Sequence, residues 1–196
     1  MPAFPFLFAF ALLSPETLIE QLRRDGAQDL RVHRVQLDAD PSLEVVLQCI
    51  IPGQGVIGRV LDHDNGVWRM IGKFNSWWRF EPADAGRFLE FRETVATGVK
   101  DIIVRYRGGG TEVSGTTVEI HRLRDGNLVN VLSVNEETTA MEHPSGNVFV
   151  TSAEITYALG RITTVTMRRP GNRRTCASYA WNEARFHFEE ENGACP

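Results

Sequence analysis

The sequence is short of lysine and lacks a long apolar run. Lys73 and Lys100 are its only lysines, and the 21 basic residues are outnumbered by 25 acidic ones, which gives a net charge of −4. A chain without positive excess lacks the field that attracts nucleic acid, so we expect no nucleic-acid partner. No apolar stretch approaches the roughly twenty residues of a membrane-spanning helix, so we also expect no transmembrane span.

Cysteine is scarce too, and none of the three cysteines lies in a C-x-x-C pair. This spacing excludes a thiolate metal cluster and a thioredoxin-like redox centre. Cys49 lies in an apolar run and is predicted to be a buried thiol. Cys176 and Cys195 bracket a hairpin-like segment, and we expect a disulfide between them that closes a loop of about 20 residues. In a cytosolic protein all three would instead be small apolar side chains.

Residues 1–13 contain the apolar segment Phe4–Leu13, with an A-x-A-like sequence at Ala9–Ala11. These features are typical of a signal peptide, although no basic residue precedes the apolar run. The alternative is a short apolar strand or a tail packed on the domain. The sequence therefore predicts a periplasmic or secreted protein, with a cytoplasmic location as the alternative.

Residues 14–196 indicate a single all-β domain with one short N-terminal helix. Ser14 is suited to cap this helix, Pro15 to its first position, and Asp25–Gly26 to its end. Beyond Gly26 the pattern consists of strands separated by turn residues. The expected strands are 30–37, 43–51, 56–61, 67–74, 87–91, 101–106, 117–123, 128–134, 147–157, 161–168, 175–181 and 185–189.

Three similar hairpins indicate an internal repeat with four strands in each unit. Asn65–Gly66 and Asp125–Gly126 are type I′ turn sequences at the tips of the first two hairpins. The units are placed at about 29–80, 84–135 and 145–190. Since four antiparallel strands make a propeller blade, we predict three tandem four-stranded units in a β-propeller-like fold. A β-sandwich or a barrel is the alternative.

The segment Gln36–Leu47, with the sequence QLDADPSLEVVL, matches the pattern D-x-D-x-x-x-E-V-V. It resembles the opening of FG-GAP/VCBS-type repeats, the integrin-alpha-like propeller family of bacteria. The hairpins at Asp62–Trp68 and Tyr179–Phe186 are similar to those that accompany this opening, so the resemblance covers about residues 29–190. It implies an extracytoplasmic adhesion or binding module rather than an enzyme.

The same resemblance implies calcium as a cofactor. The positions that match the family's calcium loop are Asp38, Asp40 and Glu44. The loop departs from the family pattern, because it is shorter and Pro41–Ser42 replaces a central Gly-Asp. The three acidic residues are therefore a partial calcium motif, and the protein without any cofactor is the alternative.

Other motifs lack the context that their chemistry needs. Gly53–Gly58 matches G-x-G-x-x-G, but Val56–Leu61 continues as a strand with no helix after it, which excludes a dinucleotide-binding turn. The histidines show no metal-ligand spacing, and no serine lies in a G-x-S-x-G elbow. We therefore expect a binding module without catalytic activity. A hydrolase or small-ligand-binding protein with a loop-built site, such as Gly108–Gly115, is the alternative.

Two surface features point to partners. Trp77 and Trp78 are adjacent and point to opposite faces of a strand, so one of them, beside Arg79, is a candidate stacking surface for a carbohydrate or a protein. Packing at a sheet edge or between units is the alternative. Arg168–Arg169 and Arg173–Arg174 place four cations on one predicted hairpin tip, which suits either an anionic partner or a solvated loop.

Overall fold

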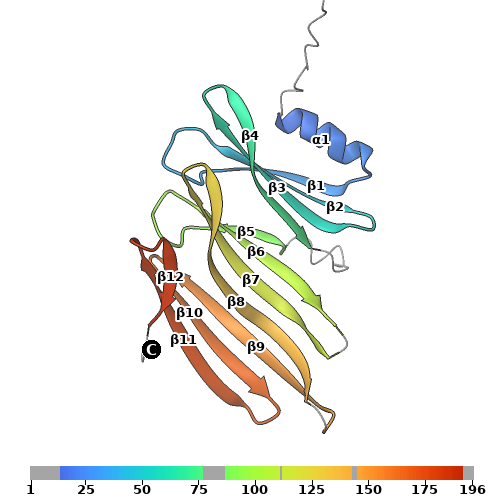
Figure 1. Ribbon diagram of the computed structural model, residues 1–196, viewed down its shortest axis with the longest axis vertical. Helices are drawn as coiled ribbons and strands as arrows, with labels where there is room; N and C mark the ends of the chain where they lie inside the picture. The colour runs from blue at the N-terminus through green and yellow to red at the C-terminus, as the bar shows by residue number, and fades with distance from the viewer. Residues whose placement is uncertain (1–13, 77–86, 111, 143–144, 192–196) are drawn as a thin grey trace, which may run out of the picture.

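A computed structural model of the chain describes residues 14–76, 87–110, 112–142 and 145–191 (Figure 1). Within these residues the protein has one helix and twelve strands. All strand pairs are antiparallel and join neighbours in the sequence, in one four-stranded and one eight-stranded sheet. Each expected strand overlaps an observed one, so the all-β class with one short N-terminal helix is confirmed.

The helix α1 (Pro15–Arg24) begins and ends where the sequence predicts. The Ser14 hydroxyl accepts a hydrogen bond from the Thr17 N–H at 3.2 Å, and the chain leaves the helix through Gly26 at φ +81°. Leu18 and Leu22 are buried against the first sheet. Among the described residues, no helix has the length and apolar character that a membrane crossing requires.

The first sheet has the order β1 (Gln28–Val35), β2 (Glu44–Ile51), β3 (Gly55–Asp64) and β4 (Val67–Ser76). β2 is buried on both faces. Alternate residues of a strand point in opposite directions, so consecutive residues of β2 pack on opposite sides of the sheet. Val45 and Leu47 pack with the helix residue Leu18, whereas Val46 packs with Ile102 and Val104 of the second sheet. The first sheet is thus the middle layer between α1 and the second sheet (Figure 1).

The second sheet contains eight consecutive strands, with β5 and β12 at its edges. Its core joins distant strands: Phe188 of β12 lies in one apolar cluster with Ile103 and Ile120, so the sheet curls onto itself. In the described residues β5 and β12 do not pair with each other, and the sheet is open. The strands are β5 (Leu89–Arg92), β6 (Asp101–Gly109), β7 (Val113–Arg124), β8 (Asn127–Glu142), β9 (Asn147–Ala158), β10 (Arg161–Arg169), β11 (Arg173–Asn182) and β12 (His187–Glu190).

The two predicted hairpin turns are confirmed. Asn65 and Gly66 have φ of 51° and 79°, and Asp125 and Gly126 have φ of 50° and 71°. Both central residues therefore lie in the left-handed region that a type I′ turn requires. These turns connect β3 to β4 and β7 to β8.

The predicted units 84–135 and 145–190 share one sheet, because β8 pairs with β9. The blades of a propeller are separate sheets, so this joint departs from the propeller-like arrangement. The physical reason is the length of β8, which runs for 16 residues and extends past Val134, the end of the expected strand. Its polar continuation supplies the backbone groups that pair with β9, as at Thr138 and Thr151.

Gly115 of β7 gives a direct test of how closely β7 and β8 approach each other. A Cβ at this position would lie 2.2 Å from the Glu137 carbonyl oxygen, which is backbone and cannot rotate away. We expect Gly115→Ala to lower the free energy of unfolding by about 2 kcal/mol or more, measured by urea denaturation. Gly110→Ala is the control, because nothing lies within 4 Å of its added Cβ. Equal stability of the two variants would contradict this register.

Candidate metal centre

Three carboxylates converge where the β1–β2 loop meets the first sheet. Asp38 and Asp40 belong to the loop, and Glu44 is the first residue of β2. One carboxylate oxygen from each lies within 4.8 Å of the other two. The structure therefore brings together the three residues that the family motif singles out, while their role as calcium ligands stays a prediction.

Short hydrogen bonds within the loop hold the carboxylates of Asp38 and Asp40. The Asp40 N–H donates to Asp38 Oδ1 at 2.9 Å, and the Ser42 N–H donates to Asp40 Oδ1 at 2.6 Å. The side-chain amide of Gln36 donates to the carbonyl oxygens of Asp38, Asp40 and Ser42. The loop is thus wrapped around Gln36, with its side-chain carboxylates turned toward Glu44.

Glu44 is fully buried, with 0% of its surface exposed. Its Oε2 accepts a hydrogen bond from the Leu37 N–H at 2.6 Å, whereas its buried Oε1 has no partner in the described part of the chain. Burial raises the pKa of Glu44 to about 7, and the charges of Asp38 and Asp62 act in the same direction. An ionised carboxylate at this position needs a positive partner.

Asp62 of β3 is the fourth acidic residue at this place, and only 4% of its surface is exposed. Its Oδ1 is buried without a partner in the described residues, and its charge contributes to the raised pKa of Asp38, of which burial is the largest cause. The β2–β3 register ends at Val45 opposite Leu61, which puts Asp62 level with Glu44. The sequence motif does not include Asp62, which lies in the predicted hairpin Asp62–Trp68; the strand register is the signal that identifies it.

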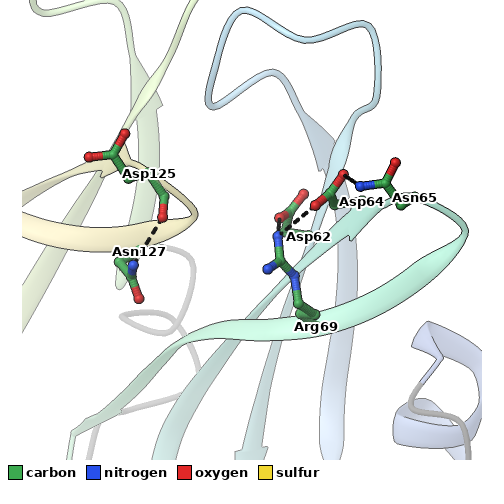
Figure 2. A network of polar contacts seen from close by, with 6 residues as sticks. All are labelled: Asp62, Asp64, Asn65, Arg69, Asp125 and Asn127. Carbon is green, nitrogen blue, oxygen red and sulfur yellow. Dashed lines mark hydrogen bonds and ion pairs between the residues drawn. The ribbon is translucent and has the colours of Figure 1, made fainter.

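Arg69 of β4 lies at the outer side of the cluster. Its Nη2 donates to Asp62 Oδ2 at 3.1 Å and to Asp64 Oδ2 at 3.2 Å, as Figure 2 shows. Both Arg69 and Asp64 are half-exposed, so their ion pair adds little stability. The main effect of Arg69 is on Asp62. The guanidinium group occupies Asp62 Oδ2, so that Asp62 Oδ1 remains the oxygen available to a ligand.

Arg69 also connects this cluster to the second sheet. A Cβ on Gly126, in the β7–β8 turn, would lie 3.5 Å from Arg69 Nη2. The same turn is fixed by Asn127, whose side chain donates to the Asp125 carbonyl oxygen at 3.0 Å (Figure 2). The acidic cluster therefore lies close to the contact between the two sheets.

The chemistry of the cluster is that of a site for a hard cation. Asp38, Asp40 and Glu44 offer only carboxylate oxygens, without the sulfur or imidazole ligands that favour zinc or copper. Calcium accepts six to eight oxygen ligands in flexible geometry, whereas magnesium requires a near-ideal octahedron. Three carboxylates on a loop and a strand end suit calcium better, with water in the remaining positions.

Several of the predicted site residues lie outside the described part of the chain. These are the candidate stacking residues Trp77, Trp78 and Arg79, and also Cys195 and the signal-like segment 1–13. The disulfide between Cys176 and Cys195 therefore stays a prediction. The prediction for Cys49 is confirmed: its thiol is free and buried, and burial raises its pKa to about 11.

The loop Gly108–Gly115, the alternative place for a site, borders an open cavity of about 300 Å³. Serine, threonine and asparagine side chains line it, and Arg107 and Glu137 are its charged residues. Thr117 Oγ1 and Asn135 Oδ1 lie 3.2 Å apart at its edge. A hydroxyl nucleophile needs an adjacent base; the described residues that line this cavity include no histidine, and their one carboxylate is that of Glu137.

No protein-family model, curated protein or solved structure matches this chain. The resemblance of Gln36–Leu47 to FG-GAP/VCBS repeats thus rests on the motif residues. The candidate metal centre rests on its own geometry.

The buried charge gives a test that needs no metal ion. With a chelator present, we expect Glu44→Gln to raise the free energy of unfolding by about 1 kcal/mol, because it removes a charge that burial and nearby carboxylates disfavour. The glutamine oxygen still accepts the Leu37 N–H. Glu20→Gln, at an exposed position of α1, is the control and should change stability little. A destabilised Glu44→Gln variant would mean that the carboxylate is satisfied within the chain.

Proposed function

We propose that this chain is an exported, non-catalytic binding module in which Asp38, Asp40 and Glu44 bind a divalent cation, with calcium as the preferred ion. The observation that supports this most is the Glu44 Oε1 atom, which is buried, has no partner among the described residues and lies beside two further carboxylates. An unpaired buried carboxylate oxygen carries a desolvation cost that a bound cation would offset.

The proposed role of the cation is to fix the β1–β2 loop to the sheet. Asp38 and Asp40 come from the loop, and Glu44 comes from a strand that is buried on both faces. A cation that binds all three would link a surface segment to this buried strand. The loop would then present a single conformation to a protein or carbohydrate partner. The entropy cost of ordering the loop would be met before the partner binds.

The strand order supports a related part of the proposal, a kinship with FG-GAP/VCBS repeats. The twelve strands divide into β1–β4, β5–β8 and β9–β12, each a run of four antiparallel neighbours. We propose that these are three repeat units, of which the last two have joined through β8 and β9. The acidic cluster would then be a cation loop retained in the first unit.

Export predicts a disulfide between Cys176 and Cys195, because an oxidising compartment is where such bridges persist. The Glu191 N–H donates to the Ser178 carbonyl oxygen at 2.8 Å, so Glu191, the last residue that the structure describes, lies beside β11. We expect intact-mass measurement of the secreted protein, with alkylation before and after reduction, to show one bridge and one free thiol, that of Cys49. Alkylation of Cys176 without reduction would contradict the bridge.

Calcium binding itself is tested by thermal unfolding and calorimetric titration. We expect calcium at about 100 times its dissociation constant to stabilise the protein by about 2.7 kcal/mol. Asp38→Asn and Glu44→Gln should each weaken the affinity at least tenfold, since the loss of a direct ligand should cost no less than the loss of its supporting partner.

Asp29→Asn is the matched control for the titration, because Asp29 is a half-exposed carboxylate of β1 that pairs with Arg31 at 2.7 Å. Its affinity for calcium should equal that of the original protein. A calcium-induced stabilisation that survives in Glu44→Gln would place the ion elsewhere. No heat of binding in the original protein would end the proposal.

A further inference from the structure

The hairpin between β10 and β11 carries an unusual concentration of positive charge. Arg168, Arg169, Arg173 and Arg174 are all exposed. Arg168 lies directly opposite Arg173 in the register of the two strands. Like charges that face each other across a strand pair destabilise it, so folding alone gives no reason for this arrangement.

Acidic side chains from the described part of the chain do not neutralise this hairpin. Within the described residues, no ion pair is recorded for Arg169, Arg173 or Arg174. Arg168 lies over the Phe149 ring, with 4.1 Å from its Cζ to the ring centroid, and this contact holds one cation at the end of the sheet. Three guanidinium groups therefore remain available to an anion from outside the chain.

Exposed apolar side chains lie on the face of the sheet that carries Arg169 and Arg174, whereas Arg168 and Arg173 lie on the opposite face. Val150 pairs with Arg169 across β9 and β10, and Val148 pairs with Met141 across β8 and β9. The exposed fractions of Val148, Val150 and Met141 are 50%, 37% and 41%. Large apolar side chains that cluster in water commonly mark an interaction surface.

This group of residues is at one extreme of the molecule. Figure 1 shows the β10–β11 turn and the ends of β8 and β9 at the bottom of the long axis, with α1 and the first sheet at the top. A hairpin at the end of an elongated molecule can meet a flat surface without obstruction from the rest of the chain. We call Arg168, Arg169, Arg173, Arg174, Met141, Val148 and Val150 the arginine tip.

We propose that the arginine tip docks on a membrane surface that contains anionic phospholipids. Guanidinium groups bind phosphate through paired hydrogen bonds, and the surface potential of anionic lipid attracts clustered basic residues. Exposed valine and methionine side chains gain by entering the boundary between headgroups and acyl chains. An acidic polypeptide would satisfy the arginines but leave this apolar group in water, so the membrane surface fits both features. The inference does not depend on the cation site.

The experiment is co-sedimentation of the full chain with vesicles, with a chelator present throughout. We expect the protein to bind vesicles of phosphatidylglycerol mixed with phosphatidylcholine, to bind phosphatidylcholine alone far more weakly, and to dissociate as salt is added. The double variant Arg169→Gln/Arg174→Gln should lower partitioning about 25-fold, at roughly fivefold for each arginine. Val148→Ser/Val150→Ser should weaken binding to vesicles but not binding to soluble polyglutamate.

Arg23→Gln/Arg24→Gln is the matched control, since it removes the same charge from an exposed pair at the other end of the molecule. Its partitioning should stay within twofold of the original. An equal loss in the control would mean that net charge alone determines binding. Binding to polyglutamate without binding to anionic vesicles would overturn the membrane proposal in favour of an acidic protein.

A second measurement needs no variant. Hydrogen exchange of the original protein should slow at residues 147–151 and 166–175 when anionic vesicles are added, and should not change in α1. Protection at α1, or vesicle binding with unchanged exchange at the arginine tip, would place the contact elsewhere and reject the proposal.

Discussion

The structure depends on the burial of both faces of β2. Alternate side chains of this strand pack against α1 on one side and against β6 on the other, so β2 holds three layers together. The same burial determines the character of the acidic cluster. Glu44 begins this strand, and its carboxylate is withdrawn from water together with the apolar residues that follow. A charged residue at the start of such a strand is costly unless a partner is supplied.

Around Glu44 the chain supplies hydrogen bonds but little positive charge. Gln36 braces the loop through carbonyl oxygens, and the Leu37 N–H satisfies one oxygen of Glu44. Arg69 approaches from outside, where it contacts Asp64 and the Oδ2 atom of Asp62. Of the four acidic side chains, Asp62 alone pairs with the half-exposed Arg69 in the described residues, and one buried oxygen each of Glu44 and Asp62 has no partner there. This imbalance is a property of the three-dimensional arrangement and does not show in the overall charge of the chain.

Local features of the fold were predictable from the sequence, because local chemistry determines them. Ser14 and Pro15 identify the helix start, and Asn65–Gly66 requires the left-handed turn that is observed. The length of β8 was not predictable in the same way. Its alternation of apolar residues ends at Val134, whereas the rest of the strand is polar and is held by backbone pairing to β9. Periodicity detects burial, and it misses strands that are stabilised mainly by their hydrogen bonds.

The candidate site also divides into residues that the sequence could group and residues that it could not. Asp38, Asp40 and Glu44 are close in the sequence, so a motif was sufficient to group them. Asp62 is distant in the sequence and becomes their neighbour only through the β2–β3 register, which a single sequence does not specify. The arginine pairs on the β10–β11 hairpin were visible as a charged turn. The position of Arg168 opposite Arg173, and that of Arg169 beside the exposed Val150, became apparent only from the strand pairing.

The strand order of the second sheet also affects how the protein behaves at high concentration. Its longest strands, β7, β8 and β9, lie inside the sheet, and its edges are formed by β5 and β12, with four residues each. An edge strand offers unpaired backbone groups to another molecule, and a long flat edge is a template for aggregation. Strands β5 and β12 are each only four residues long, so each offers few such backbone groups to a further copy of the protein.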